Sequence, residues 1–229
     1  AGDLRQALRP ARWLAAAREY CRFPMFVLPS SFMATLALSA QPFVLQSLFQ
    51  LRDVGHYAIA NRFLMIPSAL VGGAVSEAFR AEFVERLKSG ADVRGFFRRT
   101  LARLGAIAIP TFLAFFVVAP MLFAWLFGDE YRRSGELARN LCVGVLAQFV
   151  SQPFGYVFSA TGRVRTGLAI QTAVTAVPLV GTAAGGLWGG LETGLALYSA
   201  LALVACTLLV ALAYRCCPRA GVDIGEVRP

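Results

Sequence analysis

Long apolar segments alternate with short charged gaps along this chain. Six such segments, each 23 to 27 residues long, cover about 24–50, 54–79, 102–127, 138–160, 166–188 and 192–214. Each is somewhat longer than the ~20 residues that a helix needs to cross ~30 Å of hydrocarbon. Because backbone groups cannot stay unpaired in lipid, and no segment alternates as a membrane β-strand does, the segments should be helices. We therefore predict an all-α polytopic membrane protein with six transmembrane helices in one bundle.

The same pattern divides the chain into three parts. Residues 1–23 form a basic lead-in, residues 24–214 form the six-helix bundle, and residues 215–229 form a tail. The chain opens on an arginine-rich helical stretch, without an initiator methionine or a signal peptide. We expect it to begin partway through a longer protein.

Composition and charge distribution support the membrane assignment and orient the helices. Hydrophobic residues make up 57% of the chain and charged residues 15%, against roughly 25% in soluble domains. The net charge of +9 does not indicate nucleic-acid binding, because the basic residues lie in gaps between apolar segments. Seventeen Lys and Arg residues fall on the side of the two termini and four on the other side. The positive-inside rule therefore predicts that both termini are cytoplasmic.

The basic gap between the second and third segments has its own pattern. Phe79, Phe83 and Leu87 recur at helical spacing, "SGAD" interrupts the helix, and a second basic piece carries Phe96 and Phe97. This gap either lies on an anionic membrane leaflet or is a solvated connector with orienting charge. The pattern leaves both interpretations open.

Reactive residues are few. The five cysteines form no C-x-x-C pair, and His56 is the only histidine. We expect no metal site, no cofactor and no catalysis.

Arg62 stands out inside the second segment. It lies about eight residues, roughly 12 Å, from the start of that segment, and no acidic residue lies at the same depth. Either it extends to the interface or bonds to carbonyls freed by Pro67, or it faces a wet cavity and contacts an anionic substrate. Arginine suits phosphate because its guanidinium is a planar fork of donors.

Other polar residues within the segments are candidates to line such a cavity. Polar groups in lipid are costly unless paired, so they should face other helices or water. The candidates next to Arg62 and in other segments are Asn61, Gln41, Gln148 and Gln152, with Gln171 as a further polar position. For each glutamine the alternative is a hydrogen bond that joins two helices.

Several stretches together resemble a known family. "YCRFPMFVLPSSFMATLALSAQPFVL" and "VGHYAIANRFLMIPSALVGGAV" are similar to consecutive helices of bacterial polysaccharide flippases, and "PMLFAWLFGDEYRRSGELAR" and "QFVSQPFGYVFSATGRVRTGLAIQ" follow in the same order. These proteins are the O-antigen and exopolysaccharide flippases of the multidrug/oligosaccharidyl-lipid/polysaccharide exporter superfamily. The resemblance covers about residues 20 to 190 and departs in length, because the family is built from two bundles.

The resemblance implies a function. This chain would be the C-terminal half of a flippase, and a missing N-terminal bundle would pack against it around a central cavity. It would move a polyprenyl-diphosphate-linked oligosaccharide across the bacterial inner membrane by alternating access. Arg62 would hold the diphosphate, and Asn61, Gln41, Gln148 and Gln152 would line the path. The expected partners are this substrate, the missing bundle and anionic membrane lipids.

Three alternatives remain. A drug or metabolite exporter of the same superfamily would favour acidic cavity residues, which the segments lack at their centres. A membrane enzyme such as a glycan polymerase would need a sizeable external loop, and the longest external gap covers only about 128–136. A non-transporting membrane scaffold would need no accessible cavity.

Overall fold

A computed structural model describes residues 43–218 of the chain, and this part is all-helical. The long helices are α4 (Leu51–Lys88), α5 (Val93–Phe127), α6 (Arg132–Ser151) and α8 (Val164–Cys216). Short helices join them: η1 (Asp129–Tyr131), η2 (Gln152–Gly155) and α7 (Tyr156–Ala160). The predicted lead-in, most of the first predicted span and the tail beyond 218 lie outside the described residues.

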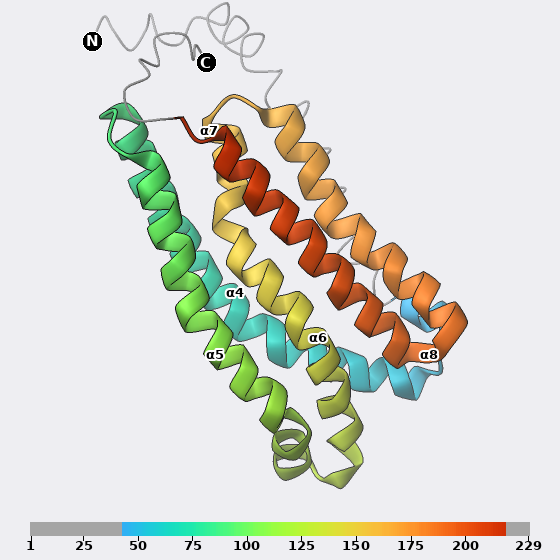
Figure 1. Cartoon of the computed structure of the whole chain (residues 1–229). Helices are drawn as coiled ribbons and strands as arrows, with labels where there is room; N and C mark the ends of the chain where they lie inside the picture. Colours follow the sequence, from blue (N-terminus) through green and yellow to red (C-terminus); the bar gives the residue numbers. More distant parts are fainter. Residues whose placement is uncertain (1–42, 219–229) are drawn as a thin grey trace, which may run out of the picture.

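Four helical segments are long and apolar enough to cross a membrane. They are Leu51–Lys88, Val93–Phe127, Asp129–Ala160 and Val164–Cys216. The last contains a break at Gly190, whose φ of 85° and ψ of −177° are not helical. The chain reverses there, and the two halves of α8 run side by side in opposite directions (Figure 1). The predicted spans 166–188 and 192–214 fall on these two halves, whereas the total of six spans stays a prediction.

Glycines allow the two halves of α8 to approach closely. A Cβ added at Gly185 would lie only 2.8 Å from the Cα of Gly194. No side chain fits between these backbones, so their contact requires glycine at both positions.

Helix α6 occupies the centre of the bundle. In its segment, 61% of the most apolar stretch is buried, against 17% in the segments of α4 and α5. Helices α4, α5 and α8 all pack against α6 (Figure 1). Helix α6 is therefore the shared packing surface for the other long helices.

The α4–α5 connection follows the predicted break, but its phenylalanines point inward. Helix α4 ends at Lys88, Gly90 has a φ of 66°, and the Asp92 side chain caps α5 by accepting a hydrogen bond from the Gly95 amide. Phe79, Phe83 and Phe97 are 0–2% exposed. These rings form part of an internal core and face neither membrane nor water, while both interpretations of the basic residues in this connection stay predictions.

That aromatic core joins four elements at the basic end of the bundle. Phe79 packs against Phe96 and Phe154 with ring centroids 5.4 and 5.2 Å apart, and Phe97 lies 4.3 Å from Phe154. Tyr214, near the end of α8, lies 5.6 Å from Phe97. The core thus fixes the ends of α4 and α8 against α5 and η2.

Polar contacts hold α4 at the opposite end. Arg52 forms an ion pair of 3.0 Å with Glu130, and Asp53 one of 3.0 Å with Arg133. His56 shares a hydrogen bond of 2.8 Å with Ser134, and both side chains are buried. These contacts attach the start of α4 to the turn between α5 and α6, and we refer to them as the outer clamp.

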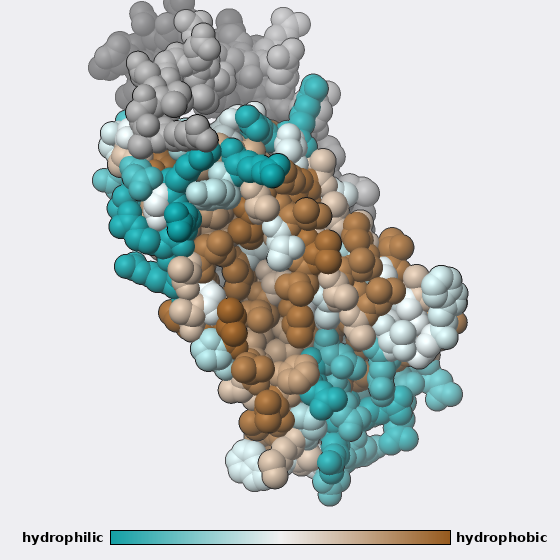
Figure 2. Space-filling view, viewed as in Figure 1, coloured by the Kyte–Doolittle hydropathy of each residue, from teal (hydrophilic) through white to brown (hydrophobic). Residues whose placement is uncertain are grey.

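An apolar belt separates the two polar ends. Figure 2 shows hydrophobic residues running across the molecule between hydrophilic regions at its upper left and lower right. Trp125 and Trp188 are 80% and 90% exposed. An apolar surface this extensive is unusual for a soluble monomer and indicates a membrane protein.

Candidate functional site

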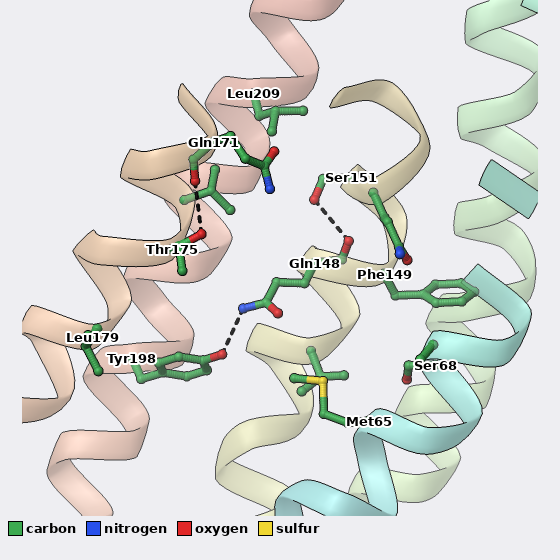
Figure 3. A pocket seen from close by; sticks show the side chains of 14 residues that line it. Met65, Ser68, Gln148, Phe149, Ser151, Gln171, Thr175, Leu179, Tyr198 and Leu209 are labelled. Carbon is green, nitrogen blue, oxygen red and sulfur yellow. Dashed lines mark hydrogen bonds between the residues drawn. The ribbon is translucent and has the colours of Figure 1, made fainter. Parts of the chain in front are cut away.

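A cavity of about 290 Å³ opens between α4, the α6–η2 junction and both halves of α8 (Figure 3). Its walls combine apolar side chains such as Met65 and Leu179 with a set of amides and hydroxyls. The polar residues that line it are Ser68, Gln148, Ser151, Gln152, Gln171, Thr175 and Tyr198. The structure thus brings Gln148 and Gln152 together in one cavity, with Gln171 opposite them.

The Gln148 side chain lines this cavity and extends from α6 toward α8. Its amide nitrogen donates a hydrogen bond of 2.8 Å to the hydroxyl of Tyr198, and its oxygen points into the open space (Figure 3). Position 148 lies four residues before Gln152 on the same face of the helical segment. Gln148 therefore joins α6 to α8 and also offers an acceptor to a ligand, so its two sequence interpretations are compatible.

The hydroxyls of the cavity bond first to their own helices. Ser68 donates to the Leu64 carbonyl at 2.7 Å, and Thr175 donates to the Gln171 carbonyl at 3.0 Å. Such bonds use the single hydroxyl proton and leave oxygen lone pairs free. Toward the cavity these side chains are acceptors.

The amides of Gln152 and Gln171 have no hydrogen-bond partner within the described part of the chain. Both side chains are exposed to the cavity. Gly72 of α4 leaves room for the Gln152 side chain. A Cβ added at position 72 would clash with the Gln152 Oε1. Each amide offers two donors and one acceptor to a ligand.

Among residues 43–218, no charged side chain lines the cavity. Its chemistry is neutral: amide donors, hydroxyl acceptors and apolar or aromatic walls. This combination suits a ligand with many hydroxyls and non-ionic faces, because each hydroxyl needs both a donor and an acceptor.

Arg62 and Asn61 lie outside the lining residues, on the same side of α4. Each comes seven residues, about two turns, before a lining residue: Ala69 for Arg62 and Ser68 for Asn61. Met65, which also lines the cavity, is one turn away. Arg62 is exposed and makes no ion pair or hydrogen bond with residues 43–218. Gln41 falls among the residues that are not described.

Sequence reasoning missed one important member of the cavity. Tyr198 sits in the second half of α8, is 6% exposed and bonds to Gln148. The available signal was a tyrosine inside a largely apolar span, since a buried tyrosine hydroxyl usually needs a partner.

The described residues contain no cluster of three or more His, Cys, Asp and Glu side chains that could hold a metal ion. The four long helices and the apolar belt indicate a polytopic membrane protein, and its internal cavity is lined by both apolar and uncharged polar side chains.

Comparison with known families gives the chain a family. The profile of a family described as polysaccharide biosynthesis protein matches residues 3–136, more than half of the chain. The chain belongs to that family. No curated protein and no solved structure matches it. The match supports a part in polysaccharide synthesis or export and ends before Gln148, so the cavity residues on α6 and α8 extend beyond it.

Proposed function

We propose that this chain is the C-terminal half of a flippase that carries a polyprenyl-diphosphate-linked oligosaccharide across the bacterial inner membrane for O-antigen or exopolysaccharide synthesis. The observation that carries the proposal is the neutral cavity with an exposed arginine on the same side of α4. The substrate has matching chemistry: uncharged, hydroxyl-rich sugars attached to an anionic diphosphate.

The residues divide between these two parts of the substrate. Gln148, Gln152 and Gln171 bond sugar hydroxyls through their amides, and Tyr198 offers an aromatic wall. Arg62 binds the diphosphate through its guanidinium fork. Asn61, and Gln41 outside the described residues, contribute further polar contacts. All of these contacts are non-covalent, so the protein changes the location of its substrate and not its bonds.

Transport requires that the cavity open to each side in turn. In the proposed mechanism a second, N-terminal bundle faces this one and the two rock about the membrane midplane. The basic end, with the α4–α5 connection and the end of α8, faces the cytoplasm. The outer clamp faces the opposite side, as the uneven charge distribution suggests.

Glycan rescue tests the proposal. Cells that lack the full-length flippase would receive full-length protein carrying wild-type Arg62, Arg62→Lys or Arg62→Ala, with membrane levels checked by immunoblot. Arg132→Ala is a matched control, because Arg132 is also exposed and lies in the α5–α6 turn away from the cavity. We expect Ala at position 62 to abolish surface glycan, Lys to restore part of it, and Arg132→Ala to match wild type.

The outcomes of this experiment test the role of Arg62 separately from the flippase assignment. Full rescue by Arg62→Ala would remove Arg62 from the substrate site while leaving the flippase assignment standing. Failure of the wild-type protein to restore any glycan, despite normal insertion, would contradict the assignment itself.

A further inference from the structure

A second groove in the described part of the chain differs in chemistry from the cavity. It has a volume of about 700 Å³ and is formed by α5, α6 and the second half of α8. Its walls are apolar, with Leu101, Ile109, Leu203 and Val210 among them. The Thr207 hydroxyl in the groove is already bonded to the Val204 carbonyl at 2.8 Å. The groove therefore suits a hydrocarbon chain and not a sugar.

The length of the groove matches one membrane leaflet. On α5 its lining residues run from Phe97 to Ile109, and on α8 from Tyr214 back to Leu203. These stretches of helix are about 18 Å and about 16 Å long. Half of a hydrocarbon core of ~30 Å is about 15 Å. A chain in the groove would extend from one interface to the bilayer midplane.

The basic end of the groove is positively charged. Arg98 lines it, is exposed, and makes no hydrogen bond or ion pair with residues 43–218. The neighbouring Arg94 stacks over Tyr214 at 5.5 Å and donates to the Cys217 carbonyl through Nε, which leaves its other guanidinium donors free. Within the described part of the chain, no acidic residue lines the groove. An anionic headgroup is the chemical complement of this end.

We propose that this groove binds one anionic phospholipid of the cytoplasmic leaflet, with an acyl chain along α5 and α8 and its phosphate at Arg98. The lipid would fill the outer seam between α5, α6 and α8 on the far side of α6 from the polar cavity. It is a structural ligand and not cargo, and the proposal does not depend on the transport function.

Competitive lipid retention tests this site. The full-length protein, purified in mild detergent, would be incubated with equal amounts of phosphatidylglycerol and phosphatidylcholine that carry the same acyl chains. Retained lipid would be counted by native mass spectrometry. We expect wild type to favour phosphatidylglycerol by about fivefold, the effect of roughly one arginine near the surface. Arg98→Ala should bring the ratio close to one.

Neighbouring residues provide matched controls. Arg99 is adjacent, exposed and outside the groove, so Arg99→Ala should keep the preference. Gly105 lines the groove and an added Cβ there would meet only the Ile109 Cδ1 at 3.8 Å, so Gly105→Leu fills the groove without a backbone clash. It should reduce retention of both lipids at least threefold, while Ala106→Leu, just outside, should not. If the Gly105→Leu variant unfolds, Thr207→Leu provides a second variant that fills the groove, from the side of α8.

Three results would overturn the proposal: equal retention of the two lipids by wild type, equal losses in Arg98→Ala and Arg99→Ala, or normal retention in both groove-filling variants. Displacement of phosphatidylglycerol by a smaller amount of polyprenyl phosphate would also overturn it, because the groove would then belong to the substrate.

Discussion

The amide of Gln148 on α6 and the hydroxyl of Tyr198 on α8 are joined by a hydrogen bond of 2.8 Å at the floor of the polar cavity. Tyr198 is 6% exposed, so water does not replace this partner easily. One bond therefore both closes the helix interface and orients a cavity amide.

We predict that Gln148→Ala lowers the free energy of unfolding by about 1–3 kcal/mol, because it leaves the buried Tyr198 hydroxyl without its partner. Tyr198→Phe should cost about 1 kcal/mol, and the double variant should cost less than the sum, as expected for partners in one bond. Thermal unfolding of the detergent-solubilised protein measures these changes. Gln171→Ala is the control, since its amide has no partner in the described structure; it should leave stability unchanged and reduce only glycan export.

Gly135 should not tolerate a side chain. A Cβ there would lie 2.5 Å from the Pro120 Cα and 2.6 Å from the Ala119 carbonyl oxygen, and backbone atoms cannot rotate away. We expect Gly135→Ala to destabilise the protein by about 1–3 kcal/mol, the usual cost of overpacking. Gly73→Ala is the matched change, because nothing lies within 4 Å of its added Cβ. It should be neutral or slightly stabilising through helix propensity, and equal losses in both variants would contradict the close approach of α5 and α6.

The two charges of the Asp53–Arg133 ion pair in the outer clamp should be interchangeable between the two positions. Asp53→Arg places a third arginine beside Arg52 and Arg133 and should lower the melting temperature, more so at low salt. Reversing the pair with Asp53→Arg and Arg133→Asp together should restore most of the loss. The neutral variant Asp53→Ala should cost less than about 1 kcal/mol, because the Arg133 side chain is 53% exposed. Absence of rescue in the double variant would show that the two charges do not interact.

Cys217 should react slowly with thiol reagents. Its burial raises the pKa of the thiol to about 12, although the Arg94 guanidinium opposes this change. At pH 8 only about one thiol in ten thousand is then ionised, and the thiolate is the reactive form. In proteins that retain a single cysteine, Cys217 should label with maleimide at least tenfold more slowly than the partly exposed Cys216. Its rate should rise about tenfold for each pH unit, and in denaturant the two rates should become equal.

Cysteine labelling also tests the orientation of the bundle. Lys88 and Glu136 are exposed, lie at opposite ends, and take part in no ion pair of the described structure. In the full-length protein without other cysteines, a membrane-impermeant maleimide added to intact cells should label Glu136→Cys and leave Lys88→Cys unlabelled until the membrane is opened. The reverse result would invert the orientation derived from the arginine distribution.

The sequence predicted helix positions better than helix contacts. The break after Lys88 and the reversal near Gly190 lie where the sequence predicted gaps, at "SGAD" and between the spans 166–188 and 192–214. The inward direction of Phe79 and Phe83 does not. In a membrane protein both the lipid-facing surface and the core are apolar, so helical spacing alone cannot show which one a phenylalanine faces.

For the cavity, too, the sequence predicted some residues but not the contacts between helices. Gln148 and Gln152 were identifiable because isolated amides in apolar spans are costly in lipid. Tyr198, the partner of Gln148, was not predicted, because it lies 50 residues away along the chain and is brought in by the packing of α6 against α8. Arg62 lies outside the residues that line the cavity, so its contact with the substrate stays a prediction.

Helix α4 is anchored at both ends and lines the cavity in its middle. The outer clamp holds its first turns, the aromatic core holds Phe79 and Phe83, and Pro67 lies between Met65 and Ser68 in the cavity wall. Pro67 removes one hydrogen bond of the helix there, and α4 bends along its length (Figure 1). Because both ends of α4 are held by contacts and Pro67 removes a backbone hydrogen bond in its middle, the helix is least stiff at the cavity wall.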